Sequence, residues 1–192
     1  MYWPARIMTL IVAALVAIHA GEPMSAGEIA FAHSEQFILS EINRLRAEQG
    51  LPQLRPNNRL YAMARSHSSN MAGTGALSHT DSLGRSFKER LGNKADERYH
   101  AGENVATNNY PDPARVAVEG WRMSPKHLKN ILNEKFTETG IGVAINSEGS
   151  VFFTQIFLGR STNFQNGKDK NYIQSSELRR LQNTDFDNPI EK

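Results

Sequence analysis

Apolar residues recur at helical spacing in two segments of the N-terminal half. In the first, Ile38, Ile42 and Leu45 fall on one face of a helix predicted over residues 35–49. The second is predicted to begin at an asparagine cap at residue 57 or 58. Its apolar stripe has intervals of four, three and four residues and consists of Leu60, Ala64, His67 and Met71. Each helix is therefore expected to pack one face on a common core.

Three shorter helices are predicted further along the chain. The first covers residues 86–91. The other two begin where Asp112 precedes Pro113 and where Ser124 precedes Pro125. In both pairs a residue that can cap the helix is followed by proline, which suits the first turn because it has no N–H group to leave unbonded.

The pattern changes to that of strands at residue 140. Residues 140–145 and 151–158 are apolar and flank a turn sequence that contains Gly149, which predicts a β-hairpin. The second strand is apolar on both alternating faces, so layers are expected above and below the sheet. The sequence therefore predicts an α+β protein, a three-layer α/β/α sandwich with this C-terminal hairpin in its central sheet.

The ends of the chain differ from this domain. Arg6 precedes an apolar run over residues 7–18 and then small residues, a pattern typical of a secretory signal peptide, with an uncleaved anchor as the alternative. After cleavage no stable transmembrane segment is expected. The predicted organisation is a signal peptide over 1–20, a flexible lead over 21–34, the folded domain over 35–160 and a polar tail over 161–192.

Composition narrows the class of protein. The 192 residues carry a net charge of +2, which provides no strong field to attract nucleic acid, and no nucleic-acid partner is expected. There is no cysteine, which excludes disulfides, thiolate metal sites and cysteine nucleophiles. We therefore expect a secreted or periplasmic monomer that folds without disulfides.

Common catalytic motifs are missing, and the residues that could bind a metal or catalyse a reaction are far apart in the sequence. The sequence has no phosphate loop, no nucleophile elbow and no H-E-x-x-H pair. His79 lies on a predicted loop over 76–84, and Glu103 lies within 92–111, a stretch without helical period. His127 is the third residue of its helix, where the helix dipole favours a neutral ring. Two neutral histidines and a carboxylate suit either a divalent metal or acid–base chemistry in which Glu103 orients a histidine. His67 is interpreted instead as a core histidine with a satisfied hydrogen bond.

Five blocks of the chain together resemble the bacterial, SCP-like branch of the CAP superfamily, named after cysteine-rich secretory proteins, antigen 5 and pathogenesis-related proteins. The resemblance spans residues 35–160. The blocks are ILSEINRLR at 38–46 with Gly50-Leu51-Pro52, LSHTD at 77–81, GENVA at 102–106, GWRMSPKHLKNIL at 120–132 and TGIGVA at 139–144.

The resemblance implies a central cleft lined by His79, Glu103 and His127. Many relatives have a second glutamate three positions after the tryptophan; this chain has Ser124 there, so we expect a triad. It also implies that a metal such as zinc would bind through His79 and His127, with Glu103 as a further candidate ligand. No catalytic residue is assigned.

Three functions are compatible with these residues. The favoured one is a binding protein, not an enzyme, whose cleft holds a small ligand, lipid or peptide, since no activated nucleophile is visible. The second is an extracellular or cell-wall hydrolase that uses the cleft as a metal site or as a general acid and base. In the third, the same residues only brace the loops.

Overall fold

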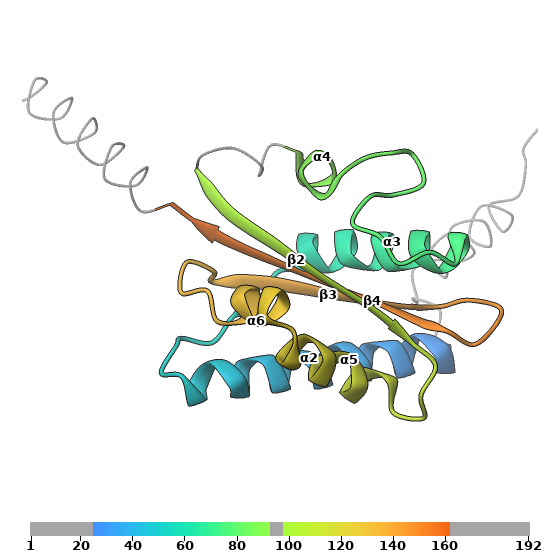
Figure 1. Ribbon diagram of the computed structural model, residues 1–192, viewed down its shortest axis with the longest axis horizontal. Helices are drawn as coiled ribbons and strands as arrows, with labels where there is room; N and C mark the ends of the chain where they lie inside the picture. Colours follow the sequence, from blue (N-terminus) through green and yellow to red (C-terminus); the bar gives the residue numbers. More distant parts are fainter. Residues whose placement is uncertain (1–24, 93–97, 162–192) are drawn as a thin grey trace, which may run out of the picture.

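The computed structural model describes residues 25–92 and 98–161, which form a four-stranded sheet with helices on both faces (Figure 1). The elements are α2 (Ala26–Glu48), β1 (Arg55–Pro56), α3 (Asn58–Thr74), α4 (Phe87–Leu91), β2 (Tyr99–Asn108), α5 (Pro113–Met123), α6 (Pro125–Ile131), β3 (Glu138–Ile145) and β4 (Val151–Arg160). The strand order is β1-β3-β4-β2. Strand β1 runs parallel to β3, and β4 is antiparallel to both of its neighbours.

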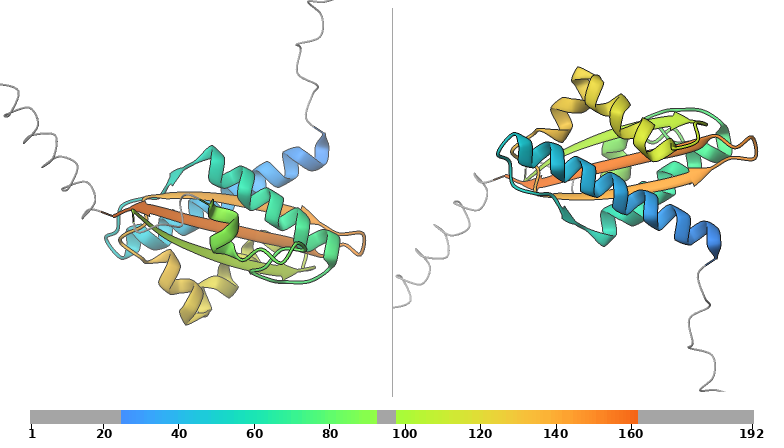
Figure 2. Two further views of the ribbon diagram at one scale, coloured as in Figure 1. Left: turned by 90° about the horizontal axis from the view of Figure 1, so that it is seen from above. Right: turned by 90° about the horizontal axis from the view of Figure 1, so that it is seen from below.

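The helices divide between the two faces of this sheet. Helices α3 and α4 lie on one face, and α2, α5 and α6 lie on the other (Figure 1, Figure 2). Strands β3 and β4 form the predicted hairpin, and β4 is buried along nearly its whole length. The predicted three-layer sandwich is confirmed.

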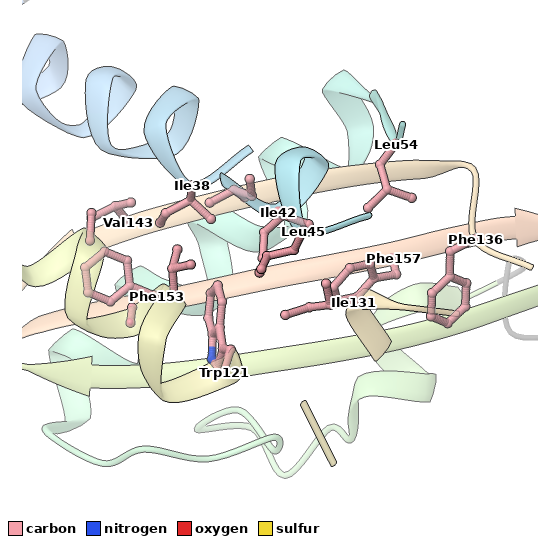
Figure 3. Close-up of a cluster of buried hydrophobic side chains, with 14 residues drawn as sticks. Ile38, Ile42, Leu45, Leu54, Trp121, Ile131, Phe136, Val143, Phe153 and Phe157 are labelled. Carbon is pink, nitrogen blue, oxygen red and sulfur yellow. The ribbon is translucent and has the colours of Figure 1, made fainter. Parts of the chain in front are cut away.

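The larger part of the core lies between the sheet and helices α2, α5 and α6 (Figure 3). Ile38 and Ile42 of α2 meet Phe153 and Phe157 of β4, and all four side chains are fully buried. Trp121 of α5 is 1% exposed, and its Nε1 donates to the carbonyl oxygen of Val105 at 3.1 Å. This bond fixes α5 to strand β2, which carries one of the candidate site residues.

On the opposite face, α3 packs directly on β3. Its buried residues include the predicted stripe of Leu60, Ala64, His67 and Met71. A Cβ atom at Gly142 would lie 2.2 Å from backbone atoms of Ala64 and Arg65, and Gly140 meets the backbone of α3 equally closely. Only glycine allows the helix and the strand to approach this far.

Two predicted segments differ from the structure. Helix α2 begins at residue 26 rather than 35, because Ser25 and Glu28 form a capping box and Phe31 packs against the core. The expectation of a flexible lead is therefore wrong from residue 26 onward. Residues 99–108 form strand β2 within a stretch that was expected to be irregular, since its short polar residues give no alternating pattern.

The predicted signal peptide at 1–20 and the predicted tail from residue 162 onward lie outside the described residues. Among the helices that are described, none is both long enough and apolar enough to cross a membrane.

Candidate functional site

Glu103 is the most deeply buried charged residue of the predicted triad. It lies on β2, and its side chain is 2% exposed. Adjacent strand residues point to opposite faces, so Glu103 shares a face with Val105, which packs against Met71 of α3. The carboxylate therefore points to the side of the sheet that α3 and α4 cover.

His79 and Arg90 both bind this carboxylate. The Nδ1 atom of His79 lies 2.8 Å from Glu103 Oε1. Nη2 of Arg90, whose side chain is 8% exposed, donates to Oε1 at 3.0 Å and to Oε2 at 2.8 Å. The same nitrogen donates to the carbonyl oxygen of His79 at 3.1 Å. Both oxygens of Glu103 are thus engaged, and the histidine is held through its ring and its backbone.

The loop that carries His79 is fixed at two further points. His67 of α3 is 2% exposed, and its Nε2 donates to the carbonyl oxygen of Ser78 at 2.8 Å. Asp81 accepts backbone N–H groups from Leu83 and Arg85 on the other side of His79. The prediction that His67 is a buried histidine with a hydrogen bond is confirmed for Nε2.

Asn104, the next residue on β2, faces the opposite layer. It is fully buried, and its Nδ2 donates to the carbonyl oxygen of His127 at 3.2 Å. Asn130 donates to Oδ1 of Asn104 at 2.8 Å and to the carbonyl oxygen of Glu103 at 3.2 Å. Helix α6, which carries His127, is therefore attached to the strand next to Glu103.

The His127 ring is half-buried and near His79. Burial lowers the pKa of His127, and the positive charge of a protonated His79 lowers it further. The ring is therefore neutral at pH 7, as the sequence predicts. The physical cause is different, however: these two effects lower the pKa, whereas the sequence argument relied on the helix dipole.

The structure brings His79, Glu103 and the α6 segment with His127 to the same edge of the sheet. Sequence reasoning missed Arg90, although its ion pair with Glu103, at 2.8 Å, is as short as that of His79. Nothing in the sequence distinguishes Arg90 from the other basic residues of the short helix α4, because its partner is on a strand that the pattern did not predict.

The two histidines suit a metal ion better than the full triad does. Nδ1 of His79 donates a hydrogen bond to Glu103, so in the neutral ring Nε2 is the nitrogen with a free lone pair. Both oxygens of Glu103 already accept hydrogen bonds from Arg90, which makes Glu103 a weaker candidate for a further ligand than the two histidines. Among residues 25–92 and 98–161, no three His, Cys, Asp or Glu side chains are placed to hold a metal together. A metal here would depend on the two histidines and on water or a bound ligand.

A profile of the CAP family, the cysteine-rich secretory protein family, matches residues 39–157. The chain belongs to the CAP family. The CAP domain is 35% identical over 127 residues to the Bacillus subtilis uncharacterized membrane protein YlbC, in an alignment that covers 66% of this chain and 35% of YlbC.

Two solved structures are similar to this CAP domain. An extracellular protein containing an SCP domain from Bacillus anthracis aligns with a TM-score of 0.59 and 28% identity, over 73% of this chain and 45% of that one. An outer surface protein from Borrelia burgdorferi aligns with a TM-score of 0.59 and 21% identity, over 67% of this chain and 94% of that one, which supports the fold alone. The chain thus spans about a third of YlbC and less than half of the Bacillus anthracis protein.

In this CAP domain the position of the second family glutamate is Ser124, at the junction of α5 and α6. Glu119, the nearest acidic residue on α5, is half-exposed and forms an ion pair with Arg122 at 2.8 Å. It therefore does not replace the missing glutamate. The described site contains one glutamate, and Arg90 neutralises it.

Proposed function

We propose that this chain is an exported CAP-domain protein whose cleft at His79, Glu103 and His127 binds a small ligand, lipid or peptide without transforming it. The state of Glu103 carries the proposal. A general base needs an oxygen free to take a proton from water or substrate. Both oxygens of Glu103 are bound by Arg90, and one also by His79. Because Glu103 is buried and most of its acceptor sites are occupied, it is better suited to position His79 than to act as the base of a hydrolase.

The histidines supply the polar contacts for a ligand. The His79 side chain is 56% exposed, and in the neutral ring Nε2 is an acceptor because Nδ1 donates to Glu103. His127 is neutral at pH 7 and adds a second polar ring. A ligand with hydroxyl or amide N–H groups would meet two acceptors held on rigid supports, which limits the entropy lost on binding.

The same two rings are the protein ligands that we propose for a divalent cation such as zinc. Imidazole nitrogen is a preferred zinc ligand, and the contact from Glu103 to His79 is the outer-shell arrangement found behind many metal-bound histidines. A bound zinc would act as a Lewis acid toward a ligand oxygen. His79 and His127 would hold it, and Glu103 would keep the His79 ring oriented.

Export is supported by the apolar N-terminal run and by the extracellular relative from Bacillus anthracis. Fractionating cells that express the chain tests export and shows whether the chain is in the periplasm, in the medium or on the cell surface. Recovery of the intact chain in the cytosol would contradict export.

The test of the cleft is calorimetric titration of zinc, then magnesium and calcium, into the protein and into the His79→Ala/His127→Ala variant. The control is His33→Ala, since His33 is exposed near the start of α2 and is not one of the site residues. Zinc binding that the double variant loses and the control keeps would support a two-histidine metal site. Equal binding by all three proteins would remove the metal from the proposal.

Lipids and cell-wall fragments are then screened for binding and for turnover in the same samples. Binding without product supports the proposal. Product formation that His79→Ala abolishes would establish the hydrolase instead, with a metal-bound water rather than Glu103 as the source of the nucleophile.

A further inference from the structure

A cavity lies on the α3 side of the sheet. It has a volume of about 630 Å³ and is bordered by α3, α4 and the turn between them. His79, Glu103 and His127 are not among its lining residues. The side chains that define its chemistry are Arg59, His67, Asn70, Asp81, Arg85 and Arg90.

The cavity is cationic. Asp81 is its one lining carboxylate, and Arg85 neutralises it with an ion pair of 2.7 Å. Arg90 is balanced by Glu103 from beyond the cavity wall. Arg59 is exposed and has no ion pair within the described ranges, 25–92 and 98–161. One arginine charge is therefore left for an anion.

Two buried residues of the wall have polar atoms without a partner. His67 is 2% exposed, and Nδ1 is buried with no hydrogen bond in the described part of the chain. The Nε and Nη1 atoms of Arg90 are likewise buried and unbonded, because Nη2 makes all of its contacts to Glu103 and His79. Unpartnered polar atoms at this depth are costly, and such groups in native proteins normally have a partner.

The unpartnered atoms of His67 and Arg90 need different kinds of hydrogen-bond partner. The Nε2 atom of His67 donates to a carbonyl oxygen, so the neutral ring presents Nδ1 as an acceptor. Arg90 can only donate. A suitable partner must therefore accept from the arginine and donate to the histidine. An oxyanion that keeps a hydroxyl group does both and also matches the charge of Arg59.

We propose that the cavity between α3 and α4 binds an oxyanion that carries a hydroxyl group, as in hydrogen phosphate or a hydroxycarboxylate. The site is separate from the proposed function of the cleft, since the two share only Arg90 at their boundary. Phosphates and hydroxycarboxylates both provide an oxyanion with a hydroxyl group, and the experiment tests the two classes of ligand separately.

The first measurement uses the full protein and two pairs of probes, titrated by calorimetry in a buffer without other oxyanions. Inorganic phosphate is compared with sulfate, which has similar size and shape but no hydroxyl at neutral pH. Glycolate is compared with acetate in the same way. Because the unmatched probe leaves Nδ1 of His67 without a donor, the hydroxylated member of a pair is expected to bind roughly tenfold tighter or more. The pair that shows the difference identifies the source.

The second measurement places a negative charge in the cavity. Ala62 lines the cavity and is exposed on α3, so Ala62→Glu keeps a good helix former and is expected to abolish binding. Ala47→Glu makes the same change at an exposed position on α2 and is expected to leave binding unchanged. Arg59→Gln is expected to weaken binding about threefold to tenfold, while Arg55→Gln, outside the cavity, has no effect.

Three results would overturn this proposal: no binding of any probe, equal binding within both pairs, or unchanged binding by Ala62→Glu. The first would mean that the cavity holds water only. The His79→Ala/His127→Ala variant is expected to bind the probes as the unmodified protein does. Ligand binding at the cleft and oxyanion binding in the cavity are therefore tested independently.

Discussion

Replacing Arg90 by methionine isolates the buried ionic contact at the site. The change removes three hydrogen bonds from Nη2, two to Glu103 and one to the carbonyl oxygen of His79. Methionine keeps much of the apolar side chain, but the Glu103 carboxylate, 2% exposed, then retains only His79 as a partner among residues 25–92 and 98–161. Removing one partner of a buried ion pair typically costs about 3–5 kcal/mol because the other charge stays buried. We expect Arg90→Met to lower the free energy of unfolding by about 3–5 kcal/mol.

The assay is urea denaturation at pH 7.5. An unchanged slope of the free energy of unfolding against urea concentration would show that the variant exposes the same surface on unfolding. Arg122→Met is the control, because its ion pair with Glu119 is half-exposed and such pairs contribute less than about 1 kcal/mol. The double variant Arg90→Met/Glu103→Gln should recover part of the lost free energy of unfolding, since it removes the buried charge that Arg90 no longer neutralises. A loss below about 1 kcal/mol for Arg90→Met, equal to the control, would refute the argument that Glu103 is buried as a carboxylate that depends on Arg90.

Three further outcomes follow from the geometry. Gly142→Ala is expected to force α3 away from β3 and to cost more than about 3 kcal/mol in thermal unfolding, whereas Gly120→Ala, with no atom near the new Cβ, should be neutral or stabilising. Asn104→Ala is expected to cost about 1–3 kcal/mol in urea denaturation and to weaken any zinc binding, because α6 loses its attachment to β2; unchanged zinc affinity would contradict this link. Burial is the main cause that lowers the pKa of both His67 and His127, so the unfolded chain takes up protons first as the pH falls below 6.5. The free energy of unfolding should therefore fall with pH below 6.5, less steeply in His67→Gln, and a rise would show that the sign is wrong.

Periodic segments were predictable from the sequence because their burial follows their spacing. The stripe on α3, the caps at Asn57 and Asp112 and the hairpin of β3 and β4 all have local signals, and the structure contains each of them. The burial of β4 on both faces was sufficient to predict layers on both sides of the sheet.

Contacts between distant segments left no local signal. Arg44 and Arg46 are two residues apart on α2, yet Arg44 forms surface ion pairs while Arg46 is fully buried. Arg46 donates to the carbonyl oxygens of Pro52, Ile131, Asn133 and Phe136, which the chain brings together only after folding. The same applies to Arg90, whose partner lies on β2. The candidate residues at 79, 103 and 127 were singled out by their positions on loops and at a helix start, but only the family resemblance placed them in one cleft, since their spacing alone does not require them to meet.

The short motif at residues 102–104 explains why the segments that carry them lie at the same edge of the sheet. A Cβ at Gly102 would lie 3.1 Å from Oδ1 of Asn130, so glycine leaves room for α6 to approach the strand. Glu103 and Asn104 then point to opposite faces of β2. Glu103 holds the His79 loop on the α3 side, and Asn104 holds the backbone of His127 on the α6 side. Because the two histidines come from different layers, their separation depends on these consecutive residues, and a shift of β2 by one residue would exchange the two faces and take the site apart.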